Sequence, residues 1–159
     1  MSTQGADRGG LSTDEAVRAM LLLMPRVVGR VKRTPLPEQL RSFNLAPRHL
    51  SLLSYLVFDG EMTVNALAER LEVAPTTVSL MVSDLTRQGV LERRGDPEDR
   101  RRTIVAITGE PATRAAIEGW LAIGARAWQK AFETLTDEER ATFVRTIHAY
   151  ECEASAADA

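Results

Sequence analysis

Five arginines gather within ten residues of a chain whose average charge is slightly acidic. The formal net charge of the 159 residues is -2, yet five of the 20 lysines and arginines fall between positions 93 and 102. A guanidinium can donate paired hydrogen bonds to a phosphate, and an arginine in the minor groove of DNA meets a strong negative potential. The cluster therefore predicts a local contact with duplex DNA, and a solvated run of charge is the alternative. Its members are Arg93, Arg94, Arg100, Arg101 and Arg102.

A second candidate set consists of short hydroxyl side chains on a predicted helix. Such side chains can approach phosphates or base edges closely, and an arginine at the far end of the helix could hold a phosphate. Leu80 and Asp84 occupy places on the same helix where a basic side chain would help, so a solvated polar face is the alternative. The residues predicted to contact DNA from this helix are Pro75, Thr76, Thr77, Ser79, Ser83 and Arg87.

Two helices joined by a short turn must position the hydroxyl set. Thr63 is predicted to cap a first helix in which Leu67 and Leu71 share a face. Residues 72–74 form the turn, and the second helix starts at the proline, which suits a first helical turn, and ends before Gly89. The inward residues predicted for the second helix are Val78, Val82 and Leu85.

A β-hairpin is predicted to carry the arginine cluster. Residues 90–94 and 103–108 are runs of strand-forming types, and the segment 95–99 between them has the residue types of a turn. Two helices followed by a hairpin give the order of a winged helix-turn-helix, whose second helix fits the major groove and whose wing reaches the minor groove. A carboxylate of the turn that pairs with an arginine would stiffen the tip.

Long amphipathic helices are predicted on both sides of this lobe. Residues 12–15 form a capping box, and apolar residues then recur at three- and four-residue spacing up to position 31. A further helix starts near Pro47 and turns Leu50, Leu53, Leu56 and Val57 toward a core. After the hairpin, a helix is predicted over 115–135, and a second capping box at 136–139 begins the last helix.

Several of these segments together resemble the MarR family, over roughly residues 13–152. The wing sequence Asp96-Pro97-Glu98-Asp99-Arg100-Arg101 is the most specific of them. The resemblance implies that Asp99 braces the wing and that Arg101 enters the minor groove. Leu80 and Asp84 depart from the family pattern, because many relatives have arginine there. The other matching segments are 67–71, 75–79, Leu85 with 89–93, and 105–108.

The resemblance also implies an obligate dimer held by the terminal helices, which fits their apolar stripes. The predicted fold class is mainly α with a small β-hairpin wing, a winged helix-turn-helix with long N- and C-terminal dimerisation helices. The predicted organisation is a disordered lead (1–11), an N-terminal dimerisation helix and linker (12–46), a winged helix-turn-helix DNA-binding lobe (47–108), C-terminal dimerisation helices (109–153) and a frayed tail (154–159).

Family members usually sense a small, often aromatic or phenolic, molecule in a cleft between the dimer helices and the DNA-binding lobe. If the helices pack as in relatives, a set of apolar residues and one histidine could line such a cleft here, whereas ordinary core residues are the alternative. The candidate cleft residues are Met24, Val28, His49, Leu53 and Trp120.

Other classes of function find little support in the sequence. A glycine-rich phosphate loop and a nucleophile elbow are missing, so no enzyme activity and no cofactor are expected. Two histidines and one cysteine provide too few soft ligands for a dedicated metal site. His148 and Cys152 share a helical face, which would allow redox sensing, although peroxide-sensing relatives carry their cysteine near the N-terminus. The longest apolar run, Met20–Met24, is too short for a membrane span, so a cytoplasmic protein is expected.

The sequence therefore predicts a sequence-specific regulator of transcription that binds double-stranded DNA. We expect a ligand-responsive repressor that binds a pseudo-palindromic operator as a homodimer. The alternative is a winged-helix module for protein interaction that has lost specific DNA binding, a possibility raised by the acidic net charge, Leu80 and Asp84.

Overall fold

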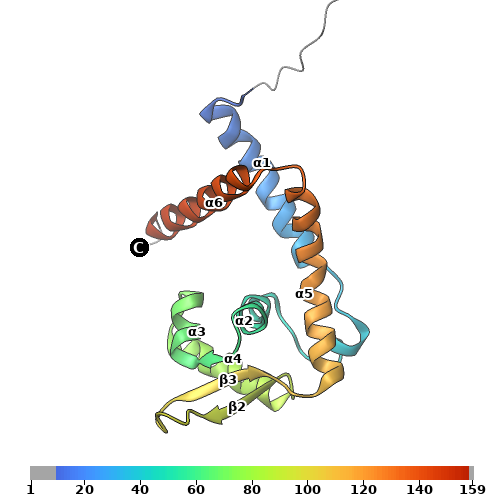
Figure 1. Cartoon of the computed structure of the whole chain (residues 1–159), viewed down its shortest axis with the longest axis vertical. Coiled ribbons are helices and arrows are strands. Elements are labelled where there is room, and N and C mark those ends of the chain that lie inside the picture. Colours follow the sequence, from blue (N-terminus) through green and yellow to red (C-terminus); the bar gives the residue numbers. More distant parts are fainter. Residues whose placement is uncertain (1–9, 158–159) are drawn as a thin grey trace, which may run out of the picture. The chain divides into compact units, whose positions relative to one another are not determined.

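The computed structural model describes residues 10–157 of the chain (Figure 1). These residues fall into two compact units that divide after Pro35, and each unit is described by itself. The predicted disordered lead at residues 1–9 and the last two residues of the predicted tail lie outside the described part.

The first unit consists of one long helix, α1 (Thr13–Lys32), and its flanking segments. The predicted capping box is confirmed, because the Ser12 hydroxyl accepts from the Glu15 amide at 3.3 Å and the Glu15 carboxylate accepts from the Ser12 amide at 2.9 Å. The hydrogen bonds from Ser12, backbone first, lower the pKa of Glu15. No residue of α1 is buried, although the helix carries several large aliphatic side chains.

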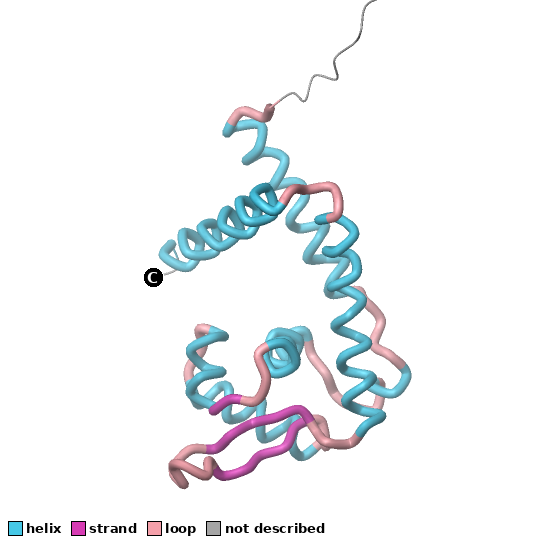
Figure 2. Tube along the Cα trace, viewed as in Figure 1, coloured by secondary structure: helices cyan, strands magenta, loops and turns pink. Residues whose placement is uncertain are grey.

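The second unit holds the remaining helices and a small sheet (Figure 2). The core lies between its helices and one face of the sheet. The predicted inward residues of the second helix of the motif are confirmed, since Val78, Val82 and Leu85 are fully buried. In chain order the elements are η1 (Glu38–Leu40), α2 (Pro47–Phe58), β1 (Met62–Thr63), α3 (Val64–Leu71), α4 (Pro75–Arg87), β2 (Leu91–Gly95), β3 (Thr103–Ile107), α5 (Pro111–Phe132) and α6 (Asp137–Ala157).

The sheet has three antiparallel strands in the order β1-β3-β2. The predicted hairpin is confirmed, and its register pairs Leu91 with Ile107 and Gly95 with Thr103. The sequence reading missed β1, which pairs Met62 with Val105 on the other edge of β3. Two residues are too few to show the alternation by which a strand is recognised in a sequence.

The C-terminal helices differ from the prediction at three ends. One of them is the end of α5, which stops at Phe132 instead of position 135. Helix α5 starts at Pro111 instead of position 115, because the Glu110 carboxylate caps it by accepting from the Ala112 amide at 3.0 Å and the Thr113 amide at 2.6 Å. Helix α6 continues through residues 154–157, where a frayed tail was expected. Alanine, the best helix former, is frequent in that stretch.

Aromatic side chains join α5 to α6. The Trp128 ring stacks on Phe132 at a centroid distance of 5.3 Å, and the Phe143 ring lies 5.7 Å from each of them. Aromatic pairs at such distances contribute about 0.5–1.5 kcal/mol beyond the area that they bury. None of the helices within residues 10–157 is both long and apolar enough to cross a lipid bilayer.

Candidate nucleic-acid interface

The helix-turn-helix is built from α3, a tight turn and α4. The Thr63 hydroxyl caps α3 as predicted, since it accepts from the Ala66 amide at 3.2 Å. At the other end, Glu72 takes a left-handed backbone conformation with φ 53°, which ends α3. Pro75 then occupies the first turn of α4, where its missing N–H leaves no hydrogen bond unmade.

Helix α4 has one apolar face and one outward face. Val78, Val82 and Leu85, together with Met81, are buried in the core. The outward face carries a stripe of four residues at four-, three- and four-residue spacing. This outward stripe consists of Thr76, Leu80, Ser83 and Arg87. All four are exposed, and Leu80 has 73% of its surface accessible. Of the other predicted contact residues on α4, Pro75 and Thr77 are exposed and Ser79 is half-buried.

Arg87 is already paired on its own helix. Its Nη2 lies 2.7 Å from the Oδ1 of Asp84, which reduces the positive charge at this end of the outward stripe. The other oxygen of Asp84 accepts from Gln88 at 3.2 Å, and the Gln88 side chain accepts from the Asn44 amide at 2.7 Å. A phosphate at Arg87 would therefore share the guanidinium with a carboxylate. The three-residue spacing of Asp84 and Arg87 was the signal of this pair in the sequence.

Asp99 organises the loop at the tip of the wing. Its Oδ1 accepts from the Arg101 amide at 3.0 Å, and its Oδ2 lies 3.4 Å from Nε of Arg102. Its carbonyl accepts from the Arg102 amide at 2.9 Å, and Asp96 and Arg102 close the loop through a backbone bond of 3.0 Å. These contacts are of the kind expected of a brace, and the paired arginine is Arg102.

The five wing arginines divide by their partners. Arg94 forms an ion pair with Glu61, and Arg93 donates to the backbone carbonyl of Ser79 on α4 at 3.4 Å. Within residues 10–157, the side chains of Arg100 and Arg101 have no ion pair or hydrogen bond, and both residues are exposed. The cluster therefore leaves two guanidinium groups available to an outside anion, both at the tip.

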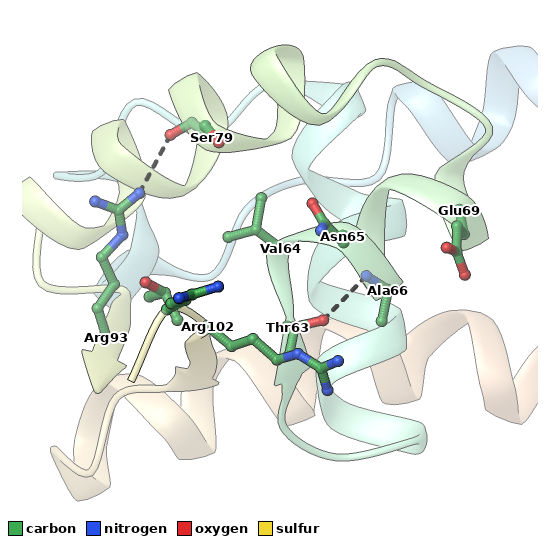
Figure 3. Close-up of a pocket in the computed structure, with 10 residues that line it drawn as sticks. Thr63, Val64, Asn65, Ala66, Glu69, Ser79, Arg93 and Arg102 are labelled. Atoms are coloured by element: carbon green, nitrogen blue, oxygen red, sulfur yellow. Dashed lines mark hydrogen bonds between the residues drawn. The ribbon is translucent and has the colours of Figure 1, made fainter. Parts of the chain in front are cut away.

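A hollow of about 550 Å³ lies between α3, the middle of α4 and the wing, and Glu69 of α3 is among the residues that line it. Figure 3 shows Arg93 extending from its strand toward Ser79, with the Thr63 cap on the opposite wall. Arg93, Arg101 and Arg102 line this hollow, and the start of a helix adds partial positive charge. Its chemistry suits an anion at the surface where α4 meets the wing.

The candidate ligand residues do not form one open surface in either unit. His49 and Leu53 are buried in the core of the second unit, and Trp120 packs against that core half-buried. Met24 is half-buried and Val28 exposed, both on α1 of the first unit. A ligand cleft formed by these five residues stays a prediction.

His49 carries a buried polar atom without a partner. Its Nδ1 accepts from the Ala46 amide at 3.1 Å, so the neutral ring carries its proton on Nε2. Nε2 is buried and has no hydrogen bond. Burial, and then the charge of Arg48, lowers the pKa of His49. Burial in the core was the alternative given for His49 above, but an unpartnered Nε2 could not be predicted, because it depends on the packing of the whole unit.

His148 and Cys152 share a face of α6, as predicted. The sulfur lies 3.4 Å from Nδ1 of the histidine, and both residues are exposed. Within the described part of the chain, no group of three or more His, Cys, Asp or Glu side chains could hold a metal ion.

Residues 43–102 match a family model described as "MarR family". This segment, which contains the helix-turn-helix and most of the wing, is similar to the MarR family. The predicted resemblance to the MarR family is confirmed over this segment.

Two curated relatives come from Bacillus subtilis. The HTH-type transcriptional repressor MdtR is 34% identical over 77 residues, which cover 46% of this chain and 50% of that protein. The uncharacterized HTH-type transcriptional regulator YsmB is 27% identical over 110 residues, covering 69% of this chain and 74% of that protein. The chain thus matches half of the first relative's length. Both are named as regulators of transcription, which supports the expectation that this chain is not an enzyme.

The fold is shared with a solved regulator from Streptomyces coelicolor. The crystal structure of the PcaV transcriptional regulator in complex with its natural ligand has a TM-score of 0.60, with 20% identity, and covers 92% of this chain and 99% of that chain. The predicted fold class, a mainly helical winged helix-turn-helix with a hairpin wing and long terminal helices, is confirmed.

Proposed function

We propose that this protein is a sequence-specific regulator of transcription that binds a pseudo-palindromic operator in double-stranded DNA, and that it represses. One observation carries the proposal: a single unit combines the exposed stripe of α4 with two wing-tip arginines, Arg100 and Arg101, whose charges no described residue neutralises. A helix of this kind fits the major groove, and a wing arginine fits the adjacent minor groove. Binding over a promoter would exclude the transcription machinery, and a cytoplasmic location follows from that role.

The proposed binding unit is a homodimer. Helix α1 buries none of its residues, and Leu21, Leu22 and Val31 are at least half exposed. On α6, Val144 and Tyr150 are 56% and 62% exposed. Aliphatic surface of this extent usually marks an interface. In the proposed assembly, residues 12–46 and 109–153 hold the dimer and residues 47–108 bind DNA, one lobe to each half-site.

A small ligand is proposed to relieve repression. Support comes from the ligand-bound PcaV structure, which shares the fold, and from the unpartnered Nε2 of His49 among the candidate cleft residues. An aromatic or phenolic molecule bound near Met24, Val28, His49, Leu53 and Trp120 would favour a separation of the two lobes that no longer matches the DNA. The ligand would act by its differential affinity for the two states.

A binding titration tests the proposed function. Fluorescence anisotropy would compare the purified protein on the duplex directly upstream of its own coding sequence with a scrambled duplex, at two salt concentrations. We expect preferential binding by a dimer that weakens as salt rises, because each phosphate contact releases counterions. Absence of binding at low salt would contradict the proposal and favour the alternative, a winged-helix module for protein interaction. The exposed Leu80 and the negative charge of Asp84 are the features that favour this alternative.

A further inference from the structure

Leu80 is the most exposed of the large apolar side chains in the described residues, at 73%. It lies in the middle of the outward stripe, with Thr76 four residues before it and Ser83 three residues after it. The residues that α4 contributes to the core lie on its opposite face, so Leu80 is outside the core of the unit. A large aliphatic group exposed in the middle of the outward stripe is placed where it could contact a molecule bound to that stripe.

The surroundings of Leu80 fit a polyanion better than an apolar protein surface. The neighbours on the stripe carry hydroxyl groups, and the free guanidinium groups of Arg100 and Arg101 belong to the same unit. A protein partner would call for a contiguous apolar patch with an anchor at its centre. One leucine between two hydroxyl side chains instead matches a polar surface that offers a single apolar group.

The major groove of DNA offers such a group. Each thymine presents its C5-methyl there, beside hydrogen-bond acceptors that suit hydroxyl side chains. We propose that Leu80 is a specificity-determining residue that contacts the 5-methyl group of a thymine in each half-site. The proposal rests on the proposed function, because it takes α4 to lie in the major groove, and it adds a chemical feature of the operator.

Deoxyuridine provides a direct test, because it differs from thymidine only by the missing methyl group. Duplexes would first be selected from a random library with the wild-type protein, and each thymine of the selected site would then be replaced by deoxyuridine in turn. One position per half-site should lose about three- to fivefold in affinity, the effect of a single methyl group leaving an apolar contact. Leu80→Met should keep this sensitivity, whereas Leu80→Ala and Leu80→Gln should lose it.

Phe58→Ala is the matched control, because Phe58 is 67% exposed on α2, away from the stripe of α4, and its removal should leave the uracil profile unchanged. Circular dichroism would verify that the exposed substitutions leave the fold intact. The proposal is overturned if uracil has no effect anywhere, or if the same position stays sensitive in Leu80→Ala. In both cases the selected site still supports specific DNA binding. If the library yields no preferred duplex, the proposed function fails and this inference fails with it.

Discussion

The wing and helix α4 both belong to the surface proposed to bind DNA, but the arginine of α4 is paired with a carboxylate, whereas two arginines of the wing are not. On α4 the one outward arginine, Arg87, pairs with Asp84, and the rest of the stripe is hydroxyl or aliphatic. On the wing, Asp99 is occupied within the loop, while Arg100 and Arg101 have no partner among residues 10–157. We infer from this difference a division of labour in the proposed complex, in which the wing would supply salt-dependent affinity and α4 would supply discrimination between sequences.

Removal of both free wing arginines should have the largest effect. For Arg100→Ala combined with Arg101→Ala, we expect affinity to fall about a hundredfold at low salt, and the salt slope to fall by about 2, one for each lost contact. The specific and scrambled duplexes should be affected alike. Anisotropy titrations over a salt series measure both quantities, and an unchanged slope would contradict the role of the wing.

Neutralising the carboxylate on α4 should strengthen binding. In Asp84→Asn, Arg87 loses its ion pair and the helix loses a negative charge, while the amide oxygen can still accept from Gln88. We expect affinity to rise about threefold and the salt slope to steepen. Asp59→Asn is the matched control, because Asp59 pairs with Arg70 outside the stripe. Weaker binding by Asp84→Asn would show that the pair positions Arg87 for its contact.

The corresponding change beside the wing is Glu61→Gln, which frees Arg94. Arg94 lies on β2 and is therefore farther from the wing tip than Arg100 and Arg101. We therefore expect a gain in affinity smaller than that of Asp84→Asn, of about twofold, measured in the same titrations. A gain larger than that of Asp84→Asn would reverse the proposed ranking of the two regions.

The smallest effect concerns the pH dependence of stability, through His49. Its pKa is lowered in the folded protein, so folding favours the neutral ring. This contribution is complete above the unfolded pKa of about 6.5 and is lost as pH falls below it. The urea midpoint should therefore drop between pH 7.5 and pH 5.5, and it should drop less in His49→Gln, whose amide can still cap α2. His148→Gln, a change of an exposed histidine, should behave as wild type.

Much of the fold could be predicted because it depends on local patterns. The capping box at Ser12, the Thr63 cap and the inward residues of α4 follow from spacing alone, and the structure has each of them. Strand β1 was missed because its position depends on pairing with β3, a contact remote in sequence. The start of α5 was misplaced because Glu110, a long carboxylate, serves as the cap.

The residues of the candidate site could be predicted from the sequence, but the pairing of its charged side chains could not. Runs of arginine indicate a wing, but a sequence does not show which arginine is paired. Glu61 and Arg94 meet across the sheet although 33 residues separate them, and the buried Nε2 of His49 depends on the packing of the whole unit. Such contacts decide which charges remain available, and they arise only from tertiary structure.

The most direct test of the division of labour is the ratio of affinities for the upstream duplex and its scrambled counterpart, measured in two variants. Arg101→Ala should weaken binding to both duplexes and leave the ratio nearly unchanged. Thr76→Ala combined with Ser83→Ala should lower the ratio and leave the affinity for the scrambled duplex nearly unchanged. If the wing variant alone abolished the ratio, or if neither variant changed either affinity, the assignment of affinity to the wing and discrimination to α4 would be contradicted.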